Sequence, residues 1–528
     1  MKTTHTALLI GVLVLSSGCT EFLDVNTNPN GPQTVSANLY LPPMLHWMVT
    51  SPQFDGRFVG HFTQQWISTS TAFSPAETWG RMGYDAGSDN GGQQWRDVYW
   101  SLGKNLIDMN AKAQAEQRWD LLGVGMILKA WGWQVLTDLH GEIIVQQAID
   151  PTRTRFDYDT QDYAYQEVKR LLDSATVLLN RTDGAVDQTY LAVGDKIYNG
   201  DRTKWLKFAY GLRALHLNHY SNKASSNPAA VIADVDLSFT GNADDALLGY
   251  PGTTTDFADY NFWGRTRNNI TLYRQTQFVV NLMNGTEFGG VVDPRMSRML
   301  AIDSANTTYR GLDINTVTRA LPFGALTVPQ QPRNLFGYVG GGGLGLPSRY
   351  LFADKSRIPV MTYAQLQFIK AEAALRMGDQ GVARPAYLNG ISAHIDFVNA
   401  RHLEAGATSV ITAPEKSAFL ADINIAPATV TLSHIMSQKY IAQWAWGHNE
   451  LWMDMRRYHY TDLDPVSGIQ VFRGFALPTT LFSDNAGNPV YRIRPRFNSE
   501  YVWNLDALRD IGGDALDYHT QILWITEP

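Results

Sequence analysis

The sequence predicts an all-α protein in which paired helices alternate with long loops. Apolar residues recur at helical spacing in many segments, and short turns separate these segments in pairs. The long stretches between the pairs are rich in glycine, proline, asparagine and aromatic residues. Paired helices with exposed apolar stripes are typical of stacked helical hairpins, although no clean 34-residue period is present.

The composition of the chain excludes several classes of protein. The 528 residues are 44% hydrophobic, 12% aromatic and 18% charged, which is typical of a globular chain rather than a disordered one. The net charge of −7 gives no electrostatic reason to bind nucleic acid. No run of 18 apolar residues predicts a membrane-spanning helix. One cysteine cannot form an internal disulfide or a cysteine-based zinc site.

The N-terminus has the features of a secretory signal over residues 1–18. Met1-Lys2 precedes an apolar run from Ala7 to Leu15, and small residues lead to Cys19. This end resembles a bacterial lipobox, with Ser16 in place of the commoner leucine. The resemblance implies that Cys19 carries a diacylglycerol and becomes the first mature residue. A plain signal peptide with an incidental cysteine is the alternative.

The remaining elements are predicted from apolar spacing and turn residues. Helices are expected over 92–118, 121–138, 168–179, 205–215, 362–377, 384–402, 430–446 and 448–458. The fifth opens with the capping-box spacing Thr362-x-x-Gln365 and closes at Gly378. Irregular structure is expected over 19–45, which forms a tether, and over 46–90, 223–265, 285–350 and 460–500. No linker divides the chain, so residues 19–528 are predicted to form a single domain.

Seven sequence blocks, in order along the chain, are shared with a known family. They are Phe22–Asn30, Gln94–Tyr99, Leu128–Ile143, Tyr198–Arg213, Met361–Ala373, Lys439–Arg457 and Arg494–Asn504. The stretch from Thr137 to Ile144 is similar to T-D-x-Y-G-D-I-P, with His140 at the tyrosine position and Ile144 at the proline position. Together the blocks resemble the SusD/RagB family of nutrient-binding outer-membrane lipoproteins.

The resemblance implies a fold, a location and a partner. The fold would be about four tetratricopeptide-like helical pairs with a large loop-rich face that carries the ligand site. The protein would be anchored to the outer membrane by lipid and exposed at the cell surface. It would bind a nutrient without a cofactor and without breaking a bond, and it would deliver that nutrient to a SusC-like TonB-dependent transporter.

Aromatic residues in polar loops are the candidate ligand contacts. Sugar rings have apolar faces and polar edges, so a site for them combines flat aromatic side chains with hydrogen-bonding neighbours. The candidates are Gln65, Trp66, Trp79, Arg81, Tyr84, Trp263, Arg265 and Tyr338. Anchoring of the loops to the core is the alternative role for these aromatics.

Other patterns predict neither a metal site nor a catalytic site. Gly340–Gly345 satisfies G-x-G-x-x-G, but Leu346-Pro347 follows it, which indicates a turn rather than a dinucleotide site. His216 and His219 share a helix face without further metal ligands, and no H-E-x-x-H motif is present. The leading hypothesis is an oligosaccharide-binding protein. The alternatives are a peptide-binding member of the family, a glycoside hydrolase whose carboxylate pair comes from distant loops, and a purely structural lid.

Overall fold

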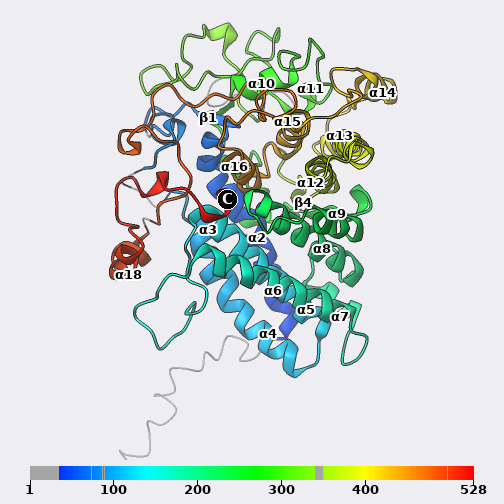
Figure 1. Cartoon of the computed structure of the whole chain (residues 1–528), viewed down its shortest axis with the longest axis vertical. Coiled ribbons are helices and arrows are strands. Elements are labelled where there is room, and N and C mark those ends of the chain that lie inside the picture. The colour runs from blue at the N-terminus through cyan, green and yellow to red at the C-terminus, as the bar shows by residue number, and fades with distance from the viewer. Residues whose placement is uncertain (1–34, 73, 86, 88–89, 339–348, 496) are drawn as a thin grey trace, which may run out of the picture.

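Helices dominate the computed structural model of the chain, shown in Figure 1. The structure describes residues 35–72, 74–85, 87, 90–338, 349–495 and 497–528. Long loops gather along the top and left of the view, and the helices fill the centre and the lower right. Cys19, the predicted signal peptide and Gly340–Gly345 lie outside the described residues.

The helices follow one another along the chain with few strands between them. They are α2 (Leu41–Phe62), α3 (Gln93–Arg96), α4 (Asn105–Ala115), α5 (Trp119–His140), α6 (Gln161–Asn180), α7 (Gln188–Gly194), α8 (Arg202–His219), α9 (Pro228–Leu237), α10 (Gln277–Met283), α11 (Met296–Met299), α12 (Tyr363–Arg376), α13 (Gln380–Glu404), α14 (Ala413–Ala421), α15 (Leu432–Gln443), α16 (His448–Arg457), α17 (Asn498–Tyr501) and α18 (Leu505–Asp510). A π-helical segment, Asp97–Lys104, joins α3 to α4.

Two short antiparallel strand pairs fasten the loops. Strand β1 (Trp66–Ser68) pairs with β3 (Tyr273–Gln275), placing Trp66 opposite Gln275. Strand β2 (Ala246–Leu248) pairs with β4 (Ile358–Met361). Each pair joins segments more than a hundred residues apart, so the loops between the helical blocks are held together over long sequence distances.

Consecutive helices pack on one another as the hairpin prediction requires. Helix α4 packs on α5, α5 on α6, α6 on α8, α8 on α9, and α12 on both α9 and α13. Short turns join α4 to α5 (Glu116–Arg118) and α12 to α13 (Met377–Asp379), whereas residues 141–160 separate α5 from α6. The predicted all-α architecture and the predicted helix positions are therefore confirmed.

Local capping sets several helix ends. The Thr362 hydroxyl accepts the Gln365 N–H at 3.2 Å and starts α12 where the sequence predicted. The reciprocal half of the capping box is not made, because the Oε1 of Gln365 has no hydrogen-bond partner in the described protein. Gly378, at φ +73°, ends the same helix in the left-handed region that glycine favours.

Two segments predicted as irregular contain helices. Helix α2 occupies residues within both 19–45 and 46–90, despite Pro42, Pro43 and Pro52. The first two prolines stand in the first turn, where their missing N–H groups cost nothing, and Pro52 is tolerated inside the helix. Helix α9 lies within 223–265 and likewise begins with a proline, Pro228, after the Asn227 cap. The predictions for 285–350 and 460–500 hold over the described residues, which contain only short helical turns there.

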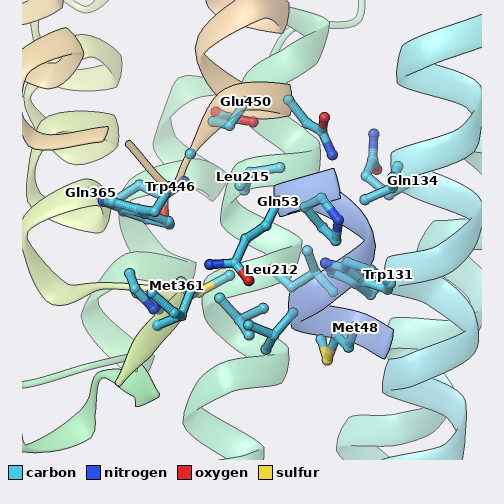
Figure 2. Close-up of a pocket in the computed structure, with 18 of the residues that line it drawn as sticks. Met48, Gln53, Trp131, Gln134, Leu212, Leu215, Met361, Gln365, Trp446 and Glu450 are labelled. Atoms are coloured by element: carbon cyan, nitrogen blue, oxygen red, sulfur yellow. The ribbon is translucent and has the colours of Figure 1, made fainter. Parts of the chain in front are cut away.

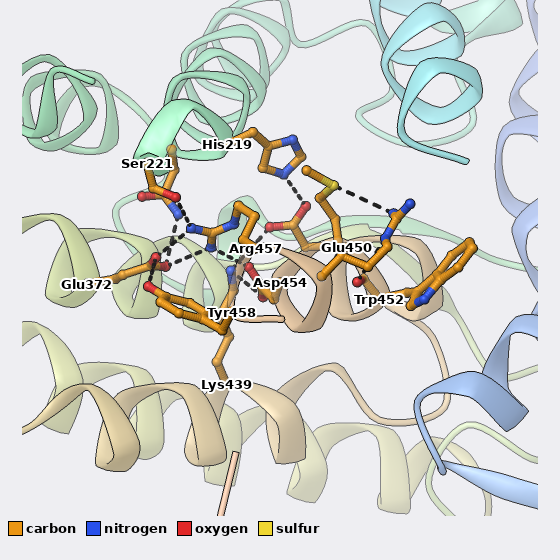
Figure 3. Close-up of polar contacts among 12 residues, drawn as sticks. His219, Ser221, Glu372, Lys439, Glu450, Trp452, Asp454, Arg457 and Tyr458 are labelled. Carbon is orange, nitrogen blue, oxygen red and sulfur yellow. Dashed lines mark hydrogen bonds and ion pairs between the residues drawn. The ribbon is translucent and has the colours of Figure 1, made fainter. Parts of the chain in front are cut away.

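A chain of buried ion pairs links helices α8, α12, α15 and α16 (Figure 3). Arg457 contacts Glu372 at 2.7 Å and Asp454 at 2.6 Å. Lys439 contacts Asp454 at 2.7 Å and Glu450 at 3.1 Å. Each charge has an opposite partner, which is what keeps charged side chains stable in a core.

Among the helices of the described residues, none has the length and apolar character required to cross a membrane.

Candidate ligand-binding site

The predicted loop tryptophans lie in the core rather than at the surface. Trp66 and Trp263 are both 0% exposed, and their rings meet edge to face at 5.4 Å. The Nε1 of Trp66 donates to the Gly56 carbonyl at 3.2 Å, and that of Trp263 donates to the Ala445 carbonyl at 2.9 Å. A ring enclosed on both faces cannot stack on a sugar, so these two side chains anchor their loops.

The neighbouring candidates are buried as well. Gln65 accepts the Ala445 N–H at 3.0 Å, and Trp79 packs beside Phe58 and Phe62. Tyr84 donates to Asp484 at 2.5 Å, and burial is the first cause that raises its pKa to about 12. Trp79 and Tyr84 therefore also take the anchoring role.

Tyr338 and the two arginines complete the predicted set. Tyr338 is buried, and the exposed Arg265 lies over its ring at 4.6 Å. Arg81 is half-buried. The structure thus buries six of the eight candidates, which favours the anchoring role for the aromatic ones, and a ligand role for Arg81 and Arg265 stays a prediction.

A groove of about 880 Å³ offers the exposed aromatic surface that those candidates lack. Its walls come from α3 and the π-helical segment, from the loop 144–156, and from residues 497–504, on the side of the molecule marked by α3 and α18 in Figure 1. The six aromatic side chains on the walls, apart from Phe54, are Trp95, Tyr99, Trp100, Phe156, Phe497 and Trp503.

Two of these tryptophans have free faces. Trp100 is 64% exposed and Trp503 is 76% exposed. Trp95 and Phe497 also line the groove but are buried, with ring centroids 5.6 Å apart. Exposed aromatic rings beside polar side chains are the kind of lining that suits a ligand with apolar faces and polar edges.

Buried polar bonds fix the walls against each other. Asn504 accepts the Phe156 N–H at 3.0 Å and donates to the Phe156 carbonyl at 2.9 Å. Tyr158 donates to Glu500 at 2.5 Å. The Phe156 bonds join the loop 144–156 to the C-terminal segment, and the Tyr158 bond adds a link two residues later, so these two walls of the groove are tied together.

The start of α3 positions the third wall. The buried Asp55 carboxylate on α2 accepts the N–H groups of Gln93 at 3.1 Å and Gln94 at 2.8 Å. Burial raises the pKa of Asp55 to about 7, although these two bonds oppose the shift. Further along, Tyr99 donates to the Ile144 carbonyl at 2.9 Å and ties the π-helical segment to the loop 144–156.

The groove continues beyond Trp100 into a second hollow of about 660 Å³. The two share Trp100, Lys104, Ile149 and Pro151. The second hollow adds Trp47, Ile107 and Asp108. An extended ligand could therefore pass along the π-helical segment and α4.

A separate and much smaller cavity lies inside the bundle (Figure 2). It measures about 90 Å³ and lies among α2, α5, α8 and β4, with Trp131, Met361 and Trp446 on its walls. In the part of the chain that the structure describes, no three His, Cys, Asp or Glu side chains are grouped to hold a metal ion.

A family model described as "Starch-binding associating with outer membrane" matches residues 29–473. The chain belongs to this SusD-like family. Its members are named for binding, which confirms the prediction of a binding protein rather than an enzyme. The family description also names an association with the outer membrane.

Solved structures of similar fold agree with the family. A SusD/RagB family protein from Bacteroides thetaiotaomicron superposes with a TM-score of 0.70 at 19% identity, covering 93% of this chain and 99% of that one. A chitin-binding SusD homolog from Flavobacterium johnsoniae gives 0.64 at 18% identity, covering 93% and 96%. These likenesses confirm the predicted SusD-like fold with its tetratricopeptide-like repeats. No curated protein matches the chain.

Three of the groove aromatics escaped prediction because they fell inside a predicted helix. Trp95, Tyr99 and Trp100 all lie within 92–118, where aromatics at helical spacing indicate a core stripe. One signal was available: Trp100 stands four residues from Arg96 and four from Lys104, so it lies on the polar face of that helix.

Proposed function

We propose that the protein is a lipid-anchored, surface-exposed binding protein that captures an oligosaccharide in the groove between Trp100 and Trp503. It then delivers the oligosaccharide to a SusC-like TonB-dependent transporter in the outer membrane. Capture involves no bond breaking. Specificity comes from stacking on the indole rings and from hydrogen bonds to the polar side chains beside them.

The observation that carries this proposal is a pair of exposed tryptophans, from two different segments of the chain, that line one groove. Asn498, Ser499 and Gln93 lie on the same walls and can pair with sugar hydroxyls. Exposed indole rings are costly in water, so their retention beside polar groups favours a ligand with apolar faces and polar edges. The family description of starch binding supports the same class of ligand.

The proposed lipid anchor and the proposed delivery to a transporter are supported by resemblances in the sequence. The lipobox resemblance around Cys19 supports a lipid anchor, because several acyl chains on one residue hold a protein stably at a membrane. The transporter partner is supported by the resemblance of the seven sequence blocks to the SusD/RagB family.

Calorimetry tests the capture step. The protein without residues 1–19 is titrated with a panel of glycans and a panel of peptides. We expect a glycan to bind, and Trp100→Ala and Trp503→Ala each to weaken that binding about two- to tenfold, the range for one aromatic contact. Phe257→Ala is the matched control, because Phe257 is an exposed aromatic outside the groove and its loss should leave binding unchanged.

Three outcomes would redirect the proposal. Binding of peptides alone would favour the peptide-binding alternative. Appearance of shorter glycans after long incubation would favour the glycoside hydrolase. Unchanged affinity in both tryptophan variants would show that the ligand binds elsewhere.

A further inference from the structure

We propose that the groove selects glycans that carry a carboxylate or sulfate group, and that Lys104 and Arg96 determine this selectivity. The inference rests on the proposed function, because it assigns a substrate class to the same groove. It is carried by the two cations that stand on either side of Trp100 along the same helical wall.

Lys104 lies beside the exposed ring. Its ammonium nitrogen is 4.5 Å from the centre of the Trp100 ring, a cation–π contact. Among the residues that the structure describes, no acidic side chain forms an ion pair with it. A ligand that stacks on the exposed part of Trp100 would therefore bring its substituents next to a positive charge that is not held in an ion pair among the described residues.

Arg96 provides a second cation, four residues before Trp100. Its guanidinium is 5.8 Å from the centre of the Trp47 ring, and the side chain is 61% exposed. A guanidinium presents a planar fork of N–H donors that matches the oxygens of a carboxylate or sulfate. Together with Lys104 it can contact two acidic groups along one chain.

The acidic side chains of the groove are engaged by the protein itself. Asp150 forms an ion pair with Arg153 at 3.2 Å, and the Glu500 carboxylate accepts hydrogen bonds from the side chains of Tyr158 and Asn504. Asp97 is buried, forms an ion pair with Arg96 at 3.4 Å and accepts hydrogen bonds from the side chains of Ser51, Gln93 and Ser101. Arg153 offsets the charge of Asp150 and Arg96 that of Asp97, whereas the neutral donors on Glu500 leave its carboxylate charged.

Asp108 is a negative charge that would oppose the binding of an acidic group. It is exposed in the second hollow, four residues beyond Lys104. Its carboxylate should disfavour an acidic group at that end of the groove. The charge pattern therefore places the acidic substituent between Arg96 and Lys104 and leaves a neutral sugar next to Asp108.

Matched glycan pairs provide the test. The protein without residues 1–19 is titrated with oligogalacturonate and its methyl ester, with glucuronoxylan and its carboxyl-reduced form, and with a sulfated galactan and its desulfated form. We expect at least one acidic member to bind about fivefold or more tightly than its neutral partner at low salt. The preference should shrink at 0.5 M salt, because exposed charges are then screened within about 4 Å.

Variants assign the effect to residues. Lys104→Gln combined with Arg96→Gln should abolish the preference, so that the acidic and neutral members of each pair bind with equal affinity. Asp108→Asn should preserve or increase it. Lys196→Gln is the matched control, since Lys196 is an exposed lysine that does not line the groove. Thermal melts verify that each variant is folded, and the salt series on the unmodified protein gives a result that depends on no variant.

The possible failures are distinct. Neutral members that bind as tightly as acidic ones in every pair, or a preference that survives the double variant, would overturn the selectivity and leave the proposed function standing. No binding to any glycan would count against the proposed function itself, and the selectivity would fall with it.

Discussion

His219 is a buried histidine surrounded by acids. Its Nε2 lies 2.8 Å from Glu450 and its Nδ1 lies 3.6 Å from Asp138, at the edge of the buried network in Figure 3. Burial opposes a charge on the ring, but the two carboxylates outweigh it and raise the pKa of His219 to about 9. The imidazolium is thus part of the charge balance that lets these acids remain in the core.

Replacement of His219 by glutamine should change how stability depends on pH. Because the folded pKa is raised, the stabilisation from His219 is fully present below pH 6.5 and is lost as the pH rises through about 9. The rise in pKa corresponds to about 3 kcal/mol. Denaturant unfolding across this range should show His219→Gln less stable at pH 6.5, with the difference narrowing toward pH 9.

His434 supplies the control for that measurement. Burial lowers its pKa to about 4, so it carries no charge that changes between pH 6.5 and 9. The variant His434→Gln should therefore keep the pH dependence of the unmodified protein. An equal loss of stability at every pH in His219→Gln would show that the ring is held uncharged.

The candidate site shows that the type of a residue and its sequence neighbours do not determine whether its side chain is buried or exposed. Residue types alone cannot distinguish Trp66, enclosed by Trp263 and His448, from Trp100, which stands in a groove. Both are tryptophans with polar neighbours. The difference is set by β1 pairing with β3 and by the C-terminal segment crossing the loop 144–156, and both are contacts between distant parts of the chain.

At the scale of elements, helices with a regular apolar stripe could be predicted from the sequence, whereas the glycine- and proline-containing helix α2 could not. Helices α6, α8 and α12 carry regular apolar stripes and were found in place. Helix α2 was missed because its glycines and prolines are typical of loops. The glycines of α2 instead allow neighbouring side chains to approach the helix backbone closely. A Cβ on Gly56 would lie 2.3 Å from the His448 ring on α16, and one on Gly60 would lie 2.5 Å from Trp66.

Gly56→Ala should therefore destabilise the protein although alanine favours helices. The methyl group would force His448 and α16 away from α2, at a cost of about 1–3 kcal/mol. This exceeds the gain of about 1 kcal/mol that alanine brings within a helix. The midpoint of urea unfolding measures the balance.

Gly381→Ala in α13 is the comparison. Gly381 is exposed, and a Cβ there would meet only the flexible Asp379 side chain, at 3.2 Å. Its replacement should leave the unfolding midpoint unchanged or slightly raised. A Gly56→Ala protein as stable as Gly381→Ala would mean that α2 and α16 are not in the close contact described.

At the scale of the whole molecule, one core extends through most of the described chain. The continuous cluster of buried apolar side chains runs from Ala37 before α2 to Phe497 beside the groove. This supports the proposal that residues 19–528 form a single domain. It also means that the groove is built on the same body as the helical hairpins, so capture of a ligand needs no independent module.

The proposed lipid anchor would hold this body at the outer membrane, and Cys19 is the residue that tests it. In the producing bacterium, the unmodified protein should incorporate labelled palmitate and sediment with the outer membrane, because several acyl chains on one residue hold it there stably. Cys19→Ser should be unlabelled and should leave that fraction. Ser16→Leu, which moves the sequence toward the commoner lipobox, should keep the label. If the protein is labelled but resists protease added to intact cells, it is anchored facing inward, which would contradict capture at the cell surface. If it is unlabelled and free in the periplasm, that result would contradict the lipid anchor itself.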